Sequence, residues 1–112
     1  MIRVYVDMVA DLFHVGHLNL IQSARKFGDT LIVGIHSDED VSSYKRMPII
    51  NEKDRYEMVR SCRYVDEVIE EAPLKITKEF LDSIDMIFMI RETTFLRWMD
   101  ELPYLKEIFF LL

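Results

Sequence analysis

A short, almost uninterrupted apolar run constrains the fold of this chain more than any other feature. Residues 30–35 read Thr-Leu-Ile-Val-Gly-Ile and lack the apolar and polar alternation of a strand with one face in water. Runs of this kind are typical of parallel strands that helices cover on both faces. The run therefore predicts an α/β fold built around a parallel sheet.

The residues before this run supply the other parts of a crossover unit. Residues 2–6, Ile-Arg-Val-Tyr-Val, are rich in β-branched and aromatic side chains and predict the first strand. From Gly16 to Phe27 apolar residues recur at helical spacing, and Gly28 stands where a C-cap glycine is expected. Strand, helix and strand in this order predict a right-handed crossover.

The alternation continues along the chain. Ser37 to Ile50 is predicted to be a polar, basic loop, because Pro48 disfavours helix in the residue before it. Asn51 is predicted to cap the next helix, with Asp54 in its first turn. Tyr56, Val59 and Cys62 are expected to face inward from this helix. The later predicted elements are a strand at 67–69, a helix capped by Thr77 and ending at Ser83, a strand at 86–90, a helix at 94–100 and a strand at 108–112.

This order of elements predicts the fold class. Strands and helices that alternate in this way form a Rossmann-like, doubly wound parallel sheet in a three-layer α/β/α arrangement. The 112 residues suffice for one modest core and are too few for two. Residues 1–112 are therefore expected to form a single domain.

Composition and charge narrow the classes of partner. Half of the residues are hydrophobic and 30% are charged, and the net charge of −6 argues against nucleic acid as a partner. No apolar stretch approaches the roughly 20 residues that cross a bilayer, and the lone Cys62 cannot form an intrachain disulfide. We therefore expect a cytoplasmic protein without a membrane span. The basic residues gather in one stretch, which favours a small polyanionic ligand: Lys45, Arg46, Lys53, Arg55, Arg60 and Arg63.

The junction between the first strand and the first helix carries the strongest candidates for binding and catalytic residues. It reads Asp11-Leu12-Phe13-His14-Val15-Gly16-His17. In a parallel α/β sheet this junction lies at the carboxyl end of a strand, where the helix N-terminus offers backbone N–H groups to an anion. His14 and His17 can point the same way across one helical turn, and Gly16 lets a phosphate come close. The arrangement favours a triphosphate, because either imidazole can donate a hydrogen bond to a phosphate oxygen.

Plainer interpretations of the histidines stay open. A single histidine near a helix start is more often a cap or a core residue than a catalyst. A zinc site is weakly supported, because the chain has three histidines and no nearby cysteine to complete a tetrahedral set. His36 lies just after the second strand, at the same sheet edge, where it is a candidate for substrate contact or a solvated strand end.

The junction resembles the His-x-Gly-His signature of the nucleotidyltransferase superfamily, and its surroundings resemble the cytidylyltransferase branch. Members of that branch couple CTP to phosphocholine, phosphoethanolamine or glycerol 3-phosphate. The resemblance covers residues 2–90. Its anchors are the junction itself, which adenylyltransferases share, the loop Tyr44-Lys45-Arg46, and the more specific Arg63-Tyr64-Val65-Asp66-Glu67-Val68.

The resemblance implies a mechanism and a set of roles. An oxygen of the acceptor's phosphate attacks the α-phosphorus of CTP directly, so positioning and charge neutralisation carry the catalysis and no covalent enzyme intermediate forms. Mg²⁺ accompanies the triphosphate and is held mainly by phosphate oxygens and water. His14, His17 and Lys45 are implied as catalytic, Val9, Ala10, Gly16, Arg55 and Arg63 as nucleotide-binding, and Asp11 and Arg46 as acceptor-binding.

Several of these residues also have simpler roles available. Asp11 is equally suited to ordering its own loop, and Lys45 is equally suited to being a solvated loop charge. Arg55 and Arg63 are equally suited to being surface ion-pair partners. Asp66 is predicted to tie down the turn before the third strand. The resemblance further implies a homodimer, with Phe95, Trp98 and Phe109 as candidate interface residues.

The sequence departs from the family at two places. Met8 and Ala10 stand where relatives have a glycine and an aromatic residue, and a methionine at a position that needs positive φ would reshape the acceptor pocket. After residue 90 the family's Gly-Asp-Asp-like turn and its Arg-x-x-x-Ile-Ser-Thr-Thr segment are absent. Because the apolar residues 108–112 normally need burial, we expect that the natural protein has further chain.

Three functions follow as hypotheses. The first is a cytidylyltransferase acting on an amino-alcohol phosphate, phosphocholine or phosphoethanolamine, ahead of glycerol 3-phosphate. The second is an adenylyltransferase, which would use the same histidines with ATP. The third is a nucleotide-binding or assembly module without catalysis, which the absent late motifs favour.

Overall fold

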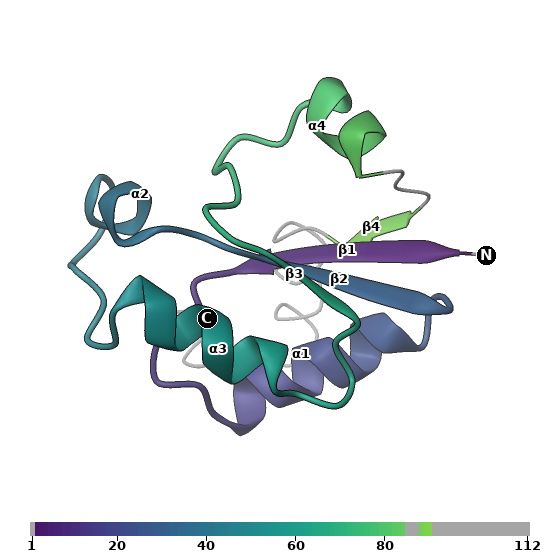
Figure 1. Cartoon of the computed structure of the whole chain (residues 1–112), viewed down its shortest axis with the longest axis horizontal. Coiled ribbons are helices and arrows are strands. Elements are labelled where there is room, and N and C mark those ends of the chain that lie inside the picture. The colour runs from purple at the N-terminus through teal and green to yellow at the C-terminus, as the bar shows by residue number, and fades with distance from the viewer. Residues whose placement is uncertain (1, 85–87, 91–112) are drawn as a thin grey trace, which may run out of the picture.

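A computed structural model describes residues 2–84 and 88–90 of the chain (Figure 1). The predicted helix at 94–100 and strand at 108–112, and the candidate interface residues, lie outside these ranges. In chain order the elements are β1 (Arg3–Met8), α1 (Val15–Arg25), β2 (Thr30–Ile35), α2 (Asp38–Ser42), α3 (Glu52–Arg60), β3 (Glu67–Ile69), α4 (Lys78–Ser83) and β4 (Phe88–Ile90).

The four strands form one parallel sheet in the order β3-β2-β1-β4. The chain adds β2 and β3 on one side of β1 and then returns to place β4 on the other side. Helices α1 and α3 cover one face, and α4 lies over the opposite face (Figure 1). The predicted doubly wound, three-layer α/β/α fold is thus confirmed. Its strand order reverses at β1, and such a switch point places a ligand crevice at the strand's carboxyl end.

The core lies between the sheet and helices α1 and α3. Alternate side chains of β1, Val4, Val6 and Met8, point to this face, because successive side chains of a strand point to opposite faces. They pack with the apolar faces of the neighbouring elements, which contribute Leu31, Val33, Ile35, Leu20, Ile21, Ala24, Tyr56 and Val59. This packing fixes both helices against the sheet, with the start of α1 at the carboxyl end of β1.

Two details at the end of the first helix differ from the sequence prediction. The helix ends at Arg25, with Lys26 as its C-cap, so Phe27 lies beyond the helix and is 45% exposed. Gly28 does not adopt positive φ. A Cβ atom there would lie 2.6 Å from the carbonyl oxygen of Ile2 and 2.7 Å from Cγ2 of Val4. Close packing against β1, rather than capping, therefore requires glycine at this position.

The prediction of a continuous loop from Ser37 to Ile50 was wrong over Asp38–Ser42, which forms the short helix α2. The Ser37 hydroxyl accepts a hydrogen bond from the N–H of Asp40 at 3.1 Å, and three acidic residues occupy the first turn. Val41 anchors the helix because it is buried. The caps predicted for the two later helices, Asn51 and Thr77, are confirmed.

Candidate nucleotide-binding site

Two histidines cap the N-terminus of α1. His14 is the N-cap residue, in extended conformation, and its Nδ1 accepts a hydrogen bond from the N–H of Gly16 at 2.9 Å. In return, Nδ1 of His17 accepts a hydrogen bond from the N–H of His14 at 3.1 Å. This reciprocal arrangement is a capping box in which imidazoles replace the usual hydroxyl and carboxylate. The cap interpretation of His14 is therefore correct, and it also determines the chemistry that the ring can offer.

The cap fixes the position of the proton on each neutral ring. Because both Nδ1 atoms accept hydrogen bonds, each neutral imidazole carries its proton on Nε2. The two ring centroids are 4.3 Å apart, and Phe13 stacks on His17, which is fully buried. Within the described part of the chain, Nε2 of His14 is buried and has no hydrogen-bond partner. A buried donor without an acceptor costs about 1–3 kcal/mol, so this N–H is suited to an acceptor from a ligand.

The loop between β1 and α1 holds two non-glycine residues in the left-handed region. Ala10 has φ of 59° and Leu12 has φ of 51°. Met8 instead lies in the extended strand β1 with its side chain in the core. The positive φ that was expected at Met8 therefore occurs two residues later, at Ala10. Each left-handed residue costs about 1–2 kcal/mol, and such conformations persist where neighbouring contacts impose them.

Asp11, between the two left-handed residues, supplies one of these contacts. Its Oδ2 and Oδ1 accept hydrogen bonds from the N–H groups of Ile49 and Ile50, each at 3.0 Å. Burial opposes ionisation of the carboxyl, but these two N–H groups and the charges of Arg46 and Arg55 lower its pKa below the ordinary value. Asp11 thus orders the loop, as its simpler interpretation predicts. Its predicted contact with the acceptor stays a prediction.

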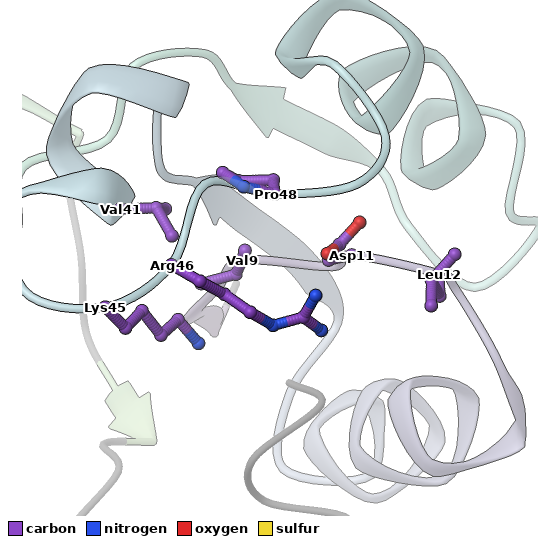
Figure 2. A pocket seen from close by; sticks show the side chains of 7 residues that line it. All are labelled: Val9, Asp11, Leu12, Val41, Lys45, Arg46 and Pro48. Atoms are coloured by element: carbon purple, nitrogen blue, oxygen red, sulfur yellow. The ribbon is translucent and has the colours of Figure 1, made fainter.

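The basic loop lies beside this anchor. A small cavity of about 30 Å³ is lined by Val9, Asp11, Leu12, Val41, Lys45, Arg46 and Pro48 (Figure 2). The exposed side chains of Lys45 and Arg46 both extend along the same side of the cavity, and that of Arg46 reaches toward Asp11 (Figure 2). The structure therefore brings the two predicted cations to the loop that leads into α1, although they are more than 30 positions away in the sequence.

Arg55 is buried at the carboxyl edge of the sheet, where the parallel strands end, rather than exposed on the surface there. Its side chain is 0% exposed, and its guanidinium donates to the carbonyl oxygens of Val9, His36 and Ile50 and to the carboxylate of Asp38. The surface ion-pair interpretation is wrong, because the pair with Asp38 is buried on the arginine side. Contact with nucleotide stays a prediction for Arg55, and for the buried Val9 and Ala10.

His36 is also buried, so its interpretation as a solvated strand end was wrong. The residue is 7% exposed, and its Nδ1 lies 3.0 Å from the carbonyl oxygen of Ala72. A carbonyl only accepts, so Nδ1 carries a proton and Nε2 faces Oδ2 of Asp7 at 3.6 Å. His36 therefore joins β1, β2 and the segment after β3, and its contact with substrate stays a prediction.

Arg63 lies at the opposite edge of the sheet, away from the histidines. Helix α3 starts at the carboxyl edge and ends at Arg60, so the residues after it emerge near the strand starts. The N–H of Asp66 donates to the carbonyl of Leu31, in the second position of β2, which marks this edge. Arg63 is exposed there and donates to the Tyr64 hydroxyl at 2.7 Å. The structure thus separates Arg63 from the predicted site.

The structural role predicted for Asp66 is confirmed. Its Oδ2 accepts a hydrogen bond from the N–H of Leu31 at 2.7 Å and lies 3.7 Å from Nη2 of Arg25. These contacts tie the turn before β3 to the start of β2. The carboxylate therefore stabilises the edge that is remote from the histidines.

Sequence reasoning missed two carboxylates that organise the site edge. Asp38 Oδ2 accepts from the N–H of Glu52, and Glu52 Oε1 accepts from the N–H of Asp38, each at 3.2 Å. The starts of α2 and α3 therefore cap one another. The sequence placed Asp38 in a predicted loop and Glu52 just after the predicted cap Asn51, and the contact between the two depends on the tertiary arrangement.

Two further properties concern the described residues only. Residues 2–84 and 88–90 contain no helix that is long and apolar enough to cross a membrane. They also contain no group of three or more histidine, cysteine, aspartate or glutamate side chains that could hold a metal ion.

The fold and the switch-point site define a doubly wound α/β protein with donors gathered at the carboxyl edge of its sheet. The chain is similar to a profile of the cytidylyltransferase-like family over residues 7–108. It therefore belongs to the cytidylyltransferase-like family, as its resemblance to the cytidylyltransferase branch predicts.

Named relatives agree with this assignment. The ethanolamine-phosphate cytidylyltransferase of Dictyostelium discoideum is 48% identical over 89 residues, which are 80% of this chain and 25% of that protein. Choline-phosphate cytidylyltransferase A of Homo sapiens is 42% identical over 105 residues, which are 92% of this chain and 26% of that protein. The chain thus spans about a quarter of the length of these relatives.

A solved structure supports the fold. The lipopolysaccharide core biosynthesis protein from Thermoplasma volcanium matches with a TM-score of 0.72 and 25% identity. The match covers 80% of this chain and 72% of that one.

Proposed function

We propose that this chain is the nucleotidyl-transfer domain of a cytidylyltransferase that couples CTP to an amino-alcohol phosphate and releases pyrophosphate. Phosphoethanolamine is the first candidate acceptor and phosphocholine the second, following the names of the relatives at 48% and 42% identity. The single observation that carries the proposal is the buried, unpartnered Nε2 of His14, held as a donor by the helix cap. A phosphate oxygen is the acceptor that this position lacks.

The reaction needs positioned donors rather than an enzyme nucleophile. An oxygen of the acceptor's phosphate forms a bond to the α-phosphorus of CTP, the bond from that phosphorus to the bridging oxygen breaks, and pyrophosphate leaves. His14 donates from Nε2 to a phosphate oxygen, and this bond strengthens as negative charge develops, while His17 holds His14 through the reciprocal cap. Contact between His17 and phosphate stays a prediction. Lys45 and Arg46, from the loop beside Asp11, neutralise phosphate charge.

A magnesium ion that enters with the nucleotide is part of this proposal, and Asp11 is the carboxylate among the residues that line the cavity beside Lys45 and Arg46. Both oxygens of Asp11 accept backbone hydrogen bonds, and we expect Mg²⁺ to be held mainly by phosphate oxygens and water, as is usual for this ion beside a triphosphate. When bound, the ion would neutralise charge on the triphosphate. Its role, like a homodimeric state and a cytoplasmic location, is part of this proposal. Sedimentation of a monomer at high protein concentration would count against the homodimer.

The test is pyrophosphate release with Mg²⁺ and either CTP or ATP, against phosphoethanolamine, phosphocholine and glycerol 3-phosphate. We expect turnover with CTP and an amino-alcohol phosphate, and loss of that turnover in His14→Asn. Preference for ATP would indicate an adenylyltransferase instead. CTP binding by calorimetry without pyrophosphate release for any acceptor would indicate a nucleotide-binding module without catalysis.

A further inference from the structure

The guanidinium of Arg55 connects four segments at the carboxyl edge of the sheet. Its Nη1 donates to the carbonyl of Val9, after β1, at 2.6 Å and to the carbonyl of His36, after β2, at 2.9 Å. Its Nε donates to Ile50, before α3, at 3.0 Å, and its Nη2 donates to Asp38, in α2, at 2.6 Å. No solvent reaches the side chain in this structure, because it is 0% exposed.

We infer that Arg55 is a positioning residue, which holds the strained loop 9–12 in the geometry of the phosphate site without touching the nucleotide. The inference rests on the proposed function, and it replaces the nucleotide-binding role that the family resemblance implies for this arginine. Four of the five guanidinium donors already have protein partners, which leaves little capacity for a ligand.

The strain in the loop explains why such a device is needed. Ala10 and Leu12 both have positive φ, and neither is glycine. Conformations of this kind persist only when the surroundings impose them. Arg55 holds the loop at Val9, immediately before the first left-handed residue, and Asp11 holds it between the two. The same arginine binds Ile50, so it also fixes the segment to which Asp11 is anchored.

The acidic partner of Arg55 is itself held in place. Asp38 uses Oδ1 for the guanidinium and Oδ2 for the N–H of Glu52, so the ion pair is part of the mutual cap between α2 and α3. A lysine would carry the same charge, but its single ammonium cannot reach carbonyls in several directions as the planar guanidinium does. Arg55→Lys therefore removes the geometry while it retains the charge.

The first test measures amide hydrogen exchange without any ligand. In Arg55→Lys we expect the N–H groups of Ile49 and Ile50, which Asp11 accepts, to exchange about tenfold faster or more. The N–H of Leu31, which Asp66 accepts at the opposite edge, should be unchanged and excludes global unfolding. Val59→Ala is the matched control, because it weakens the core packing of the same helix without touching the guanidinium.

The second test separates positioning from nucleotide contact. For the reaction of CTP with the preferred acceptor, we expect Arg55→Lys to lower kcat by about 10²-fold with a smaller change in KM, because misplacement by about 1 Å costs that much. Val59→Ala should retain the parent kcat. If Arg55→Lys does not fold, Asp38→Asn provides a milder loosening of the same loop, with exchange at Ile49 and Ile50 still faster than in the parent.

The possible outcomes distinguish this inference from the proposed function. Unchanged exchange at Ile49 and Ile50 in a folded variant would overturn the positioning role, and with lost CTP affinity it would assign Arg55 to direct nucleotide contact. Faster exchange at these two sites alone supports positioning. If the parent protein bound no CTP and released no pyrophosphate, the proposed function would fail, while the exchange data would still decide whether Arg55 holds the loop.

Discussion

His14 has a different use for each of its ring nitrogens. Nδ1 accepts the N–H of Gly16 and starts the helix, while Nε2 keeps the proton and lies buried without a partner among the residues that the structure describes. Asn and Gln reproduce one nitrogen position each, because the amide of Asn lies near Nδ1 and that of Gln can reach the position of Nε2. The two roles can therefore be separated by substitution.

We predict opposite effects for these two variants. His14→Asn keeps a good N-cap, so its free energy of unfolding should equal that of the parent. The variant lacks the Nε2–H donor and should therefore lower kcat by about 10²–10³-fold. His14→Gln should lose about 1 kcal/mol of unfolding free energy with the cap and keep part of the CTP affinity. Urea denaturation measures the stability, pyrophosphate release measures kcat, and calorimetry measures the CTP affinity. Equal loss of activity at unchanged stability in both variants would contradict the assignment of one role to each nitrogen.

Asp11 gives a pH-dependent prediction. Its pKa is lowered in the native state, so its stabilising contribution is fully present above the ordinary aspartate range, near about pH 4, and is lost as the pH falls through the lower native pKa. The amide resonances of Ile49 and Ile50 should titrate with this carboxyl when followed by NMR. The stability difference between the parent and Asp11→Asn should shrink over the same acidic range. A midpoint at or above the ordinary value would show that the two N–H groups do not hold the carboxylate.

At the scale of elements, the connections between helices and strands set what the site can be. The loop from β1 to α1 contains the two left-handed residues, and the connection from α1 to β2 contains Gly28, packed against β1. The first connection is held by Arg55, which donates to Val9 from outside the loop, and by Asp11 within the loop, which accepts from Ile49. The second depends on the absence of a side chain.

We predict that Gly28→Ala lowers the free energy of unfolding by about 1–3 kcal/mol, because the added Cβ overlaps the carbonyl of Ile2 and the side chain of Val4. Since the φ of Gly28 is not positive, the cost is steric rather than conformational. Lys26→Ala, at the exposed C-cap two residues earlier, is the control and should change stability by less than about 0.5 kcal/mol. Urea denaturation of the three proteins measures both effects, and equal stability of the parent and Gly28→Ala would refute the steric explanation.

At the scale of the whole molecule, the parallel sheet places the candidate site at the edge where its strands end and the contacts of Asp66 at the edge where they start. The carboxyl edge gathers His14, Asp11 and the basic loop, and the amino edge carries Asp66 and Arg63. Because all the strands run in the same direction, a helix that starts at one edge ends near the other. Asp11 and Asp66 both accept backbone N–H groups, but they lie at opposite edges of the sheet. Removing one or the other is therefore expected to have different effects on CTP binding.

We predict that Asp66→Ala lowers the free energy of unfolding by about 1 kcal/mol, since a partly exposed charged hydrogen bond to Leu31 is lost. CTP affinity, measured by calorimetry at a temperature where the variant is fully folded, should remain that of the parent. Asp11→Asn should instead weaken CTP binding, because it loosens the loop that leads into α1. Loss of CTP affinity in Asp66→Ala would mean that the amino edge contributes to the site.

The sequence by itself determined the fold class and the position of the candidate site. The apolar run at residues 30–35 indicated a strand buried on both faces, and the spacing of His14, Gly16 and His17 indicated a helix start suited to an anion. These are local properties, because a strand's alternation and a helix's cap depend on residues within a few positions of one another. The resemblance to cytidylyltransferases also rests on local motifs, and the family assignment confirms it.

Only the tertiary structure decided which polar residues meet. The burial of Arg55 depends on carbonyls from segments up to 46 positions away, and the distance of Arg63 from the site depends on the direction of α3. Positive φ occurs at Ala10 rather than at Met8, and the neighbouring Val9 is held by Arg55, which is 46 positions away in the sequence. A sequence pattern specifies the preference of a segment, but the partners of a long-range hydrogen bond are set by the packing of several segments at once. That physical difference is why the elements could be predicted and the roles of individual charged residues could not.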